Sequence, residues 1–355
     1  MTSNMTSNRE TTIIRIVDMH TAGEPVRIVE AGYPPLAGNT ILEKRRDAQT
    51  RFDHLRTMLM LEPRGHDGMY GVIPTEPCAA GADLAVLFTH QEGYSTMCGH
   101  ATIAIGRWAI DTGRIARVDG KARFGLEAPC GVIQVDVETD EAGVTRVAFE
   151  SVESFASALD RAVEVPGLGP VHVDIAFGGA FYAILPASRI GLSLMETPLA
   201  ELVQAATAIT EAIRTSGPIV HPTEPDLGFL YGTILTDDVA LGMHGGQPSY
   251  NLCIFADGQI DRSPTGSGVT ARIALAAAKD EMTVGDSREI RGVSGEGFVG
   301  TLAATSGTGL DAVSRVRVAG QAWYSGRSEM IAEPGDRFGA GFTLPRRLAD
   351  LDTPV

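Results

Sequence analysis

The fold of this chain is indicated by two short segments, MCGHATIA at residues 97–104 and PTGSGVTA at residues 264–271. Each is a small turn with glycine that opens an alanine-rich helical pattern. The two segments lie about half the chain apart. This spacing predicts two similar halves, each presenting a helix N-terminus to a cleft between them.

Most of the remaining sequence predicts antiparallel strands, because short β-branched runs alternate with Gly, Pro or Asp. The predicted strands cover residues 12–17, 26–30, 85–89, 132–137, 144–149 and 171–177. Helical periodicity predicts fewer helices, over residues 41–61, 100–112, 198–215 and 269–279. The segment 166–170 (PGLGP) breaks both patterns and is the predicted linker between the halves.

The predicted division follows from that linker. The N-terminal half, residues 1–166, carries Cys98 and is completed by the C-terminal segment 330–355. The C-terminal half, residues 167–329, carries Thr265.

Composition limits the classes of function. The chain has 355 residues, 44% of them hydrophobic, with a net charge of −15, so a nucleic acid or an anionic membrane surface is not an expected partner. The longest apolar runs, such as residues 273–278, are far shorter than a bilayer requires. Four cysteines without metal-site spacing, and an N-terminus (MTSNMTSNRETT) without the features of a signal peptide, predict a reduced cytoplasmic protein. Oligomeric state is left open, and a homodimer is compatible with the sequence.

Cys98 precedes a predicted helix, where free backbone N–H groups and the positive end of the dipole bind a carboxylate and lower a thiol pKa. His100 can hydrogen-bond the thiol or a substrate, and Gly99 lets an anion approach the backbone closely. Taken alone, this motif is more typical of a buried core cysteine. A second helix start of similar composition at Thr265 favours a pocket between two facing helix ends.

Several segments together resemble the proline racemase family. They are VDMHTAGEP at 17–25, EPRGHDGMYG at 62–71, MCGH at 97–100, FGGAFYAI at 177–184, DRSPTGSG at 261–268 and DRFG at 336–339. The resemblance extends from about Ile14 to Pro345. It implies an α+β fold of the diaminopimelate-epimerase type, with two pseudo-symmetric halves in which a curved, mostly antiparallel sheet wraps a central helix.

The resemblance also implies a chemistry. Racemases of the family have a cysteine in each half, whereas this sequence has Cys98 in one half and Thr265 in the other. A threonine hydroxyl is too weak an acid to serve as the second base at neutral pH, so inversion by two bases is not expected. Members with this Cys and Thr combination resemble dehydratases of trans-3-hydroxy-L-proline, in which one thiolate removes the Cα proton and elimination of water leads to Δ1-pyrroline-2-carboxylate. The resemblance implies that Cys98 is this base and that Thr265, from the opposite wall, helps the hydroxyl depart or shuttles a proton through water.

The matching positions imply the remaining roles. The residues that resemble those holding the substrate carboxylate and ring are Gly99, His100, Gly266 and Ser267, and Asp261 matches the residue near the ring nitrogen. The resemblance implies a small imino acid as substrate. No organic cofactor or metal is expected, because no dinucleotide fingerprint, Walker motif or clustered ligand set is present. For Asp18, His20 and Glu24, a structural hydrogen-bonded turn is at least as consistent with the sequence as a catalytic role.

Two other functions stay open from the sequence. A proline or 4-hydroxyproline epimerase would work with Thr265 through a water and would incorporate solvent deuterium with inversion at Cα. A non-catalytic amino-acid binding protein would have no need of Cys98.

Overall fold

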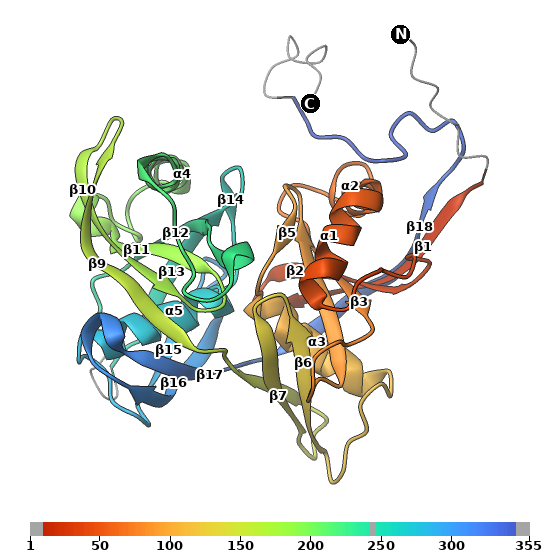
Figure 1. Ribbon diagram of the computed structural model, residues 1–355, viewed down its shortest axis with the longest axis horizontal. Helices are drawn as coiled ribbons and strands as arrows, with labels where there is room; N and C mark the ends of the chain where they lie inside the picture. Colours follow the sequence, from red (N-terminus) through yellow and green to blue (C-terminus); the bar gives the residue numbers. More distant parts are fainter. Residues whose placement is uncertain (1–9, 242–245, 346–355) are drawn as a thin grey trace.

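The computed structural model describes residues 10–241 and 246–345, and Figure 1 shows two bodies lying side by side. The first body contains β1 (Thr12–Thr21), β2 (Glu24–Ala31), α1 (Ile41–Arg51), α2 (Asp53–Met60), β3 (Tyr70–Thr75), β4 (Leu84–His90), β5 (Tyr94–Ser95), α3 (Gly99–Asp111), β6 (Lys121–Ala128), β7 (Gly131–Thr139), β8 (Thr145–Glu150) and β18 (Ala322–Ala332). The second contains β9 (Ser154–Val165), β10 (Gly169–Phe177), β11 (Phe181–Pro186), α4 (Leu199–Ser216), β12 (Leu230–Thr236), β13 (Ser249–Phe255), β14 (Gln259–Ile260), α5 (Gly266–Ala278), β15 (Ser287–Arg291), β16 (Gly297–Ser306) and β17 (Val313–Gly320). Short 3-10 turns cover Ala187–Ile190, Pro225–Leu227 and Gly309–Asp311. The repeated MTSN at residues 1–8 lies outside the described residues.

The two bodies repeat one strand order. In the first, the paired strands follow one another as β18, β1, β2, β3, β4, β6, β7 and β8. In the second, the corresponding order is β9, β10, β11, β12, β13, β15, β16 and β17. In each order the same two pairs are parallel, β2–β3 and β4–β6 matching β11–β12 and β13–β15, and the other pairs are antiparallel. The prediction of an α+β fold with two similar, mostly antiparallel halves is confirmed.

The parallel pairs explain where the central helices lie. Parallel strands need a crossover connection, which is usually a helix. Helix α3 occupies the crossover from β4 to β6, and α5 occupies the equivalent crossover from β13 to β15. Every residue of α5 is buried, because its sheet closes around it through the pairing of β17 with β9. Strand β17 also pairs with β8 and so joins the two sheets.

The segment 166–170 is not a linker. It forms the turn of the hairpin between β9 and β10, where Val165 pairs with Gly169 and both Gly167 and Gly169 have positive φ. Glycine and proline interrupt regular structure in a tight turn as well as in a linker, so composition does not separate the two. The strand pairing instead favours crossings between the bodies at residues 151–153, after β8, and at residue 321, before β18. We therefore propose that the first half ends near residue 150 and is completed from β18 onward.

Each predicted strand or helix lies within an observed element or extends past it by at most a few residues, except the helix predicted over residues 41–61. The helical pattern at 41–61 is divided into α1 and α2 by Phe52, whose backbone leaves the helical region at φ −127° and whose ring packs edge-on against Tyr33. Within the described residues, no helix is both long enough and apolar enough to cross a membrane.

Candidate active site

The N-termini of the two central helices meet at the boundary between the two bodies. Cys98 is the N-cap residue of α3 and Thr265 is the N-cap residue of α5. The helix ends touch through their first residues, since a Cβ atom on Gly99 would lie 2.4 Å from the Cα of Gly266. Two positive helix ends therefore meet among buried residues, an arrangement that favours an anionic ligand there.

Cys98 is buried, with 6% of its surface exposed, and its Sγ lies 3.1 Å from Nδ1 of His100. Burial raises the pKa of the Cys98 thiol well above its ordinary value, although the N–H of Ala101 in the first turn of α3 acts in the opposite direction. The expectation that the helix end lowers this pKa is wrong, because desolvation outweighs the helix. The thiol consequently needs a neighbouring base to become a thiolate.

His100 has the properties of that base. Burial lowers the pKa of His100, so the ring is neutral at physiological pH. The backbone of Pro25 acts in the opposite direction and raises the pKa. A neutral imidazole has one ring nitrogen that can accept a proton, and Nδ1 is the ring nitrogen nearer to the thiol. The residue is held from the other side by Thr21, whose hydroxyl donates to the His100 carbonyl over 2.9 Å.

The opposite wall is built by a tight loop that precedes α5. Thr265 has a φ of 60°, an uncommon conformation for a β-branched residue. Its hydroxyl donates to Oδ2 of Asp261 over 2.7 Å, and its backbone N–H donates to the hydroxyl of Ser263 over 3.1 Å. The Ser263 N–H in turn donates to Oδ1 of Asp261 over 2.8 Å. The single proton of the Thr265 hydroxyl is thus already engaged, and the hydroxyl offers only its lone pairs to an incoming group.

Aromatic side chains from both bodies surround the helix ends. Ser267 Oγ lies 2.7 Å from the hydroxyl of Tyr182, and the Tyr70 ring packs edge-on against His100 with centroids 4.8 Å apart. The linked buried rings are Tyr70, His90, His100, Tyr182, Tyr231 and Phe255. Electrostatic interactions are stronger among such buried rings than in water.

The structure brings together all the residues that the sequence singled out as site candidates. Cys98 and His100 form one wall, Asp261 and Thr265 form the other, and the remaining three, Gly99, Gly266 and Ser267, lie in the first turns of the helices. Of the other cysteines, Cys253 is buried in β13 beside the Thr265 side chain, and burial raises its pKa. Cys78 is exposed and Cys130 is partly buried.

Sequence reasoning named Glu24 but did not place it in the site, since a structural turn was at least as consistent with the sequence as a catalytic role. This residue begins β2 in the first body, and its Oε2 accepts the backbone N–H of Arg262 in the second body over 2.7 Å. The motif HTAGEP gave a signal, but its spacing does not reveal a contact with a residue more than 200 positions away.

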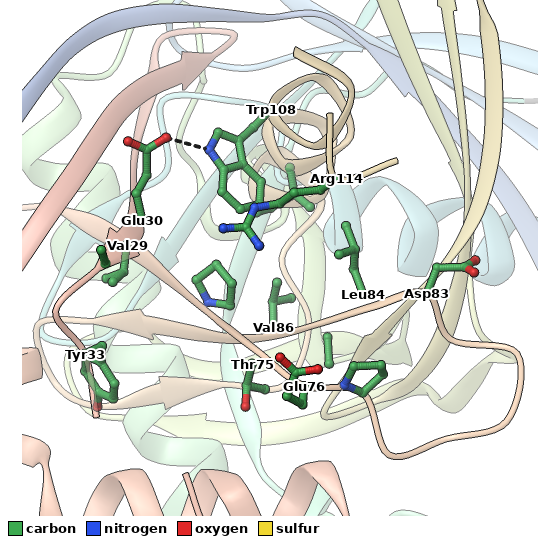
Figure 2. Close-up of a pocket in the computed structure, with 15 residues that line it drawn as sticks. Val29, Glu30, Tyr33, Thr75, Glu76, Asp83, Leu84, Val86, Trp108 and Arg114 are labelled. Carbon is green, nitrogen blue, oxygen red and sulfur yellow. Dashed lines mark hydrogen bonds between the residues drawn. The ribbon is translucent and has the colours of Figure 1, made fainter. Parts of the chain in front are cut away.

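A separate cavity of ≈ 410 Å³ lies along the first body (Figure 2). Glu30 there accepts the indole N–H of Trp108 over 3.1 Å, and the Arg114 guanidinium lies 4.6 Å from the Trp108 ring centre. Trp108 is ten residues beyond Cys98, about 15 Å along α3 at the usual helical rise. This cavity is therefore distinct from the site at the N-termini of α3 and α5.

Within the described residues, no group of three or more His, Cys, Asp and Glu side chains is arranged to hold a metal ion. The groups near the helix ends are a thiol, an imidazole, carboxyl groups, hydroxyls and backbone N–H groups.

Known proteins similar to this chain agree in family. The sequence model described as proline racemase matches residues 16–343. A human protein named trans-3-hydroxy-L-proline dehydratase is 44% identical over 339 residues, covering 94% of this chain and 95% of its own length. A protein of the same name from Colwellia psychrerythraea is 41% identical over 332 residues, covering 93% of this chain and 92% of its own length.

Solved structures share the fold. A probable proline racemase from Agrobacterium radiobacter, with bound carbonate, has a TM-score of 0.85 at 26% identity and covers 93% of this chain and 96% of its own. A hydroxyproline epimerase from Agrobacterium vitis, with bound trans-4-hydroxy-L-proline, has a TM-score of 0.86 at 23% identity, with coverage of 94% and 96%.

Proposed function

The chain belongs to the proline racemase family, and we propose that it is a trans-3-hydroxy-L-proline dehydratase that eliminates water without a cofactor. The observation that carries this proposal is the asymmetry of the two walls. One helix end carries a thiol with an adjacent imidazole, and the other carries a threonine whose hydroxyl donates a hydrogen bond to Asp261. This arrangement supplies one strong base, as an elimination requires.

The substrate carboxylate binds between the helix ends. The backbone N–H groups of Gly99, His100, Gly266 and Ser267 lie in the first turns of α3 and α5, where no intrahelical acceptor is available. The two positive dipole ends and the absence of side chains on Gly99 and Gly266 let the carboxylate approach both helices.

Asp261 binds the ring nitrogen of the substrate. Its carboxyl is buried and is already oriented by the Ser263 N–H and the Thr265 hydroxyl. A carboxylate beside the secondary ammonium keeps that nitrogen charged, and the charge acidifies the Cα proton. Thr265 therefore acts by positioning Asp261 and leaves the second face of the substrate without a base.

Cys98 removes the Cα proton. His100 accepts the thiol proton at the 3.1 Å contact, which overcomes the raised pKa of the buried thiol, as in other Cys–His pairs. The thiolate takes the Cα proton, the electron pair forms a double bond between Cα and C3, and the C3–O bond breaks. Proton transfer from nitrogen to C3 then converts the enamine product to Δ1-pyrroline-2-carboxylate.

Incubation of the purified protein with trans-3-hydroxy-L-proline in D2O tests this function. We expect pyrroline-2-carboxylate to appear, detected as its o-aminobenzaldehyde adduct, with rates that do not change after dialysis against EDTA. An epimerase would instead yield the opposite epimer of proline or trans-4-hydroxy-L-proline with deuterium at Cα. A binding protein would retain the ligand and convert none of it.

A further inference from the structure

The carboxyl of Glu24 occupies an unusual position at the boundary between the two bodies. Its side chain is 0% exposed. One oxygen, Oε2, accepts the backbone N–H of Arg262 over 2.7 Å and lies 3.5 Å from the guanidinium of the same residue. Arg262 directly follows Asp261, so Glu24 is attached to the loop that forms the second wall of the site.

The other oxygen of Glu24 is buried without a partner. No hydrogen-bonding group within residues 10–241 and 246–345 satisfies Oε1. A buried polar atom without a hydrogen bond is energetically unfavourable, so native proteins rarely retain one without a use. An unsatisfied oxygen on a residue that holds the Asp261–Thr265 loop indicates a group that completes its bonding when that loop binds a substrate.

The charges around Glu24 determine its protonation. Burial raises the pKa of Glu24 well above its ordinary value, and the negative charge of Asp261 raises it further. The Arg262 contacts act in the opposite direction but do not offset these two effects. These effects favour the protonated form of Glu24 in the folded protein, and since Oε2 accepts the Arg262 N–H, Oε1 is the oxygen available to carry a proton. The charge of Glu24 also acts on Cys98, in the direction that raises the pKa of the thiol.

The proposed elimination lacks an acid for its leaving group. Hydroxide is a poor leaving group and departs readily only when it receives a proton. Cys98 removes the Cα proton after passing its own proton to His100, and the Thr265 hydroxyl donates to Asp261. The Thr265 hydroxyl is thus not free to protonate the departing oxygen, and the proton that His100 accepts lies at its contact with the Cys98 thiol.

We propose that Glu24 is the catalytic acid of this reaction, whose Oε1 proton passes to the 3-hydroxyl of the substrate as the C3–O bond breaks. The oxygen leaves as water and Glu24 becomes a carboxylate. The proton that His100 accepted from Cys98 then returns to Glu24, while Cys98 keeps the former Cα proton until it exchanges with solvent. This inference rests on the proposed dehydratase activity and adds a residue to it.

The test compares two leaving groups in the Glu24→Gln variant. Glutamine keeps the size of the side chain and an oxygen that accepts the Arg262 N–H, but it has no acidic proton. Hydroxide from trans-3-hydroxy-L-proline needs a proton, whereas fluoride from trans-3-fluoro-L-proline is a weak base and leaves without one. We expect Glu24→Gln to lower kcat/KM for the hydroxy substrate by about a hundredfold or more, the usual effect of losing a general acid, and fluoride release by less than about threefold.

A matched control lies in the same strand. Glu30, six residues further along, accepts the indole N–H of Trp108 in the separate cavity of Figure 2. Glu30→Gln should leave both rates unchanged. Glu24→Asp is a second variant, in which the acid is retained but withdrawn by one methylene group, and it should also slow hydroxide elimination more than fluoride release.

The outcomes are distinct. Equal losses for both substrates would mean that Glu24 only positions the Arg262 loop, and unchanged rates would mean that it takes no part; either overturns the inference. Wild-type protein that forms no pyrroline-2-carboxylate would instead overturn the dehydratase proposal itself.

Discussion

Gly99 and Gly266 lie against each other so closely that a Cβ atom on Gly99 would be 2.4 Å from the Cα of Gly266, and one on Gly266 would be 2.6 Å from the Cα of Gly99. The glycines thus set the separation between the thiol wall and the threonine wall. A methyl group on either cannot be accommodated by a side-chain movement, because the atoms it meets belong to backbone. The distance between the walls is therefore fixed by the absence of a side chain at both glycines.

Gly99→Ala should separate the helix ends. We expect kcat/KM to fall at least about a hundredfold, since a displacement of about 1 Å has that effect on a preorganised site. Overpacking should also lower the free energy of unfolding by about 1–3 kcal/mol. Steady-state kinetics and urea unfolding measure both. The control is Gly326→Ala in β18, where a Cβ atom meets nothing within 4 Å, and a Gly99→Ala enzyme as active as this control would refute the role of the close contact.

The helix ends could be predicted from the sequence because their signal is local. A small turn followed by an alanine-rich run identifies both α3 and α5, and their similarity predicts two matching halves. The prediction of a linker was wrong because residues 166–170 have the composition of a hairpin turn as well as of a linker. Which of the two forms depends on whether β9 and β10 pair, and that is a property of the whole sheet.

The electrostatics of the site could not be predicted in the same way. A cysteine at a helix N-terminus should have a lowered pKa, yet the burial of Cys98 by residues from both bodies reverses the direction. The sequence left the role of Glu24 open because its contact with Arg262 joins segments that only the fold brings together. A sequence motif does not show which side chains are buried or which contacts form between the bodies, and the electrostatics of this site depend on both.

Cys98→Ser should abolish turnover while the protein stays folded. A serine at the N-cap of α3 preserves the helix, but its hydroxyl does not ionise near pH 7 even with His100 beside it. We expect kcat to fall by more than about a hundredfold with trans-3-hydroxy-L-proline. Cys78→Ser, at an exposed position, is the control and should behave as wild type. Substantial turnover by a folded Cys98→Ser variant would rule out the thiolate mechanism.

Because of His90, the free energy of unfolding should be lower in mild acid than at neutral pH. Burial lowers the pKa of His90 to about 3, whereas in the unfolded chain it is about 6.5. Above pH 6.5 both states are neutral and His90 adds no pH dependence. As the pH falls from about 6.5 toward 3, the unfolded state gains a proton that the folded state does not, so the free energy of unfolding decreases by about 2 kcal/mol between pH 7 and pH 5.

The His90 variant isolates this contribution. Urea unfolding at pH 7 and pH 5 should show that the free energy of unfolding of His90→Gln decreases less over this interval than that of wild type. His54 is exposed, and His54→Gln should show the same decrease as wild type. An identical pH dependence in the His90→Gln variant and wild type would show that His90 is protonated in the folded state.

Glu24→Gln should stabilise the protein increasingly as the pH rises. The pKa of Glu24 is raised in the folded state, so its contribution is fully present below the unfolded value of about 4.3 and is lost as the pH rises toward the folded pKa. Glutamine has no proton to lose. The difference in free energy of unfolding between variant and wild type should therefore grow in favour of the variant from pH 5 to pH 7. A difference that shrinks with rising pH would mean that Glu24 is ionised in the folded protein.

Thr265→Cys restores a thiol on the second wall and should introduce some inversion at Cα of proline or trans-4-hydroxy-L-proline. Thr265 is β-branched and holds a φ of 60°, so the unbranched cysteine relieves rather than adds backbone strain. The thiol is also a weaker donor to Asp261 than the hydroxyl it replaces, and a thiolate there becomes the second base that wild type lacks. The gain should be small, because a thiol about 1 Å from its productive position loses roughly a hundredfold in rate. Chiral chromatography and deuterium incorporation in D2O measure it, with Thr265→Ser as the control that keeps a hydroxyl and should give no inversion. If a folded Thr265→Cys variant binds pyrrole-2-carboxylate but neither exchanges the Cα proton nor forms the opposite epimer, then the residue at 265 does not separate elimination from inversion, and the asymmetry of the two walls is not the basis of the reaction.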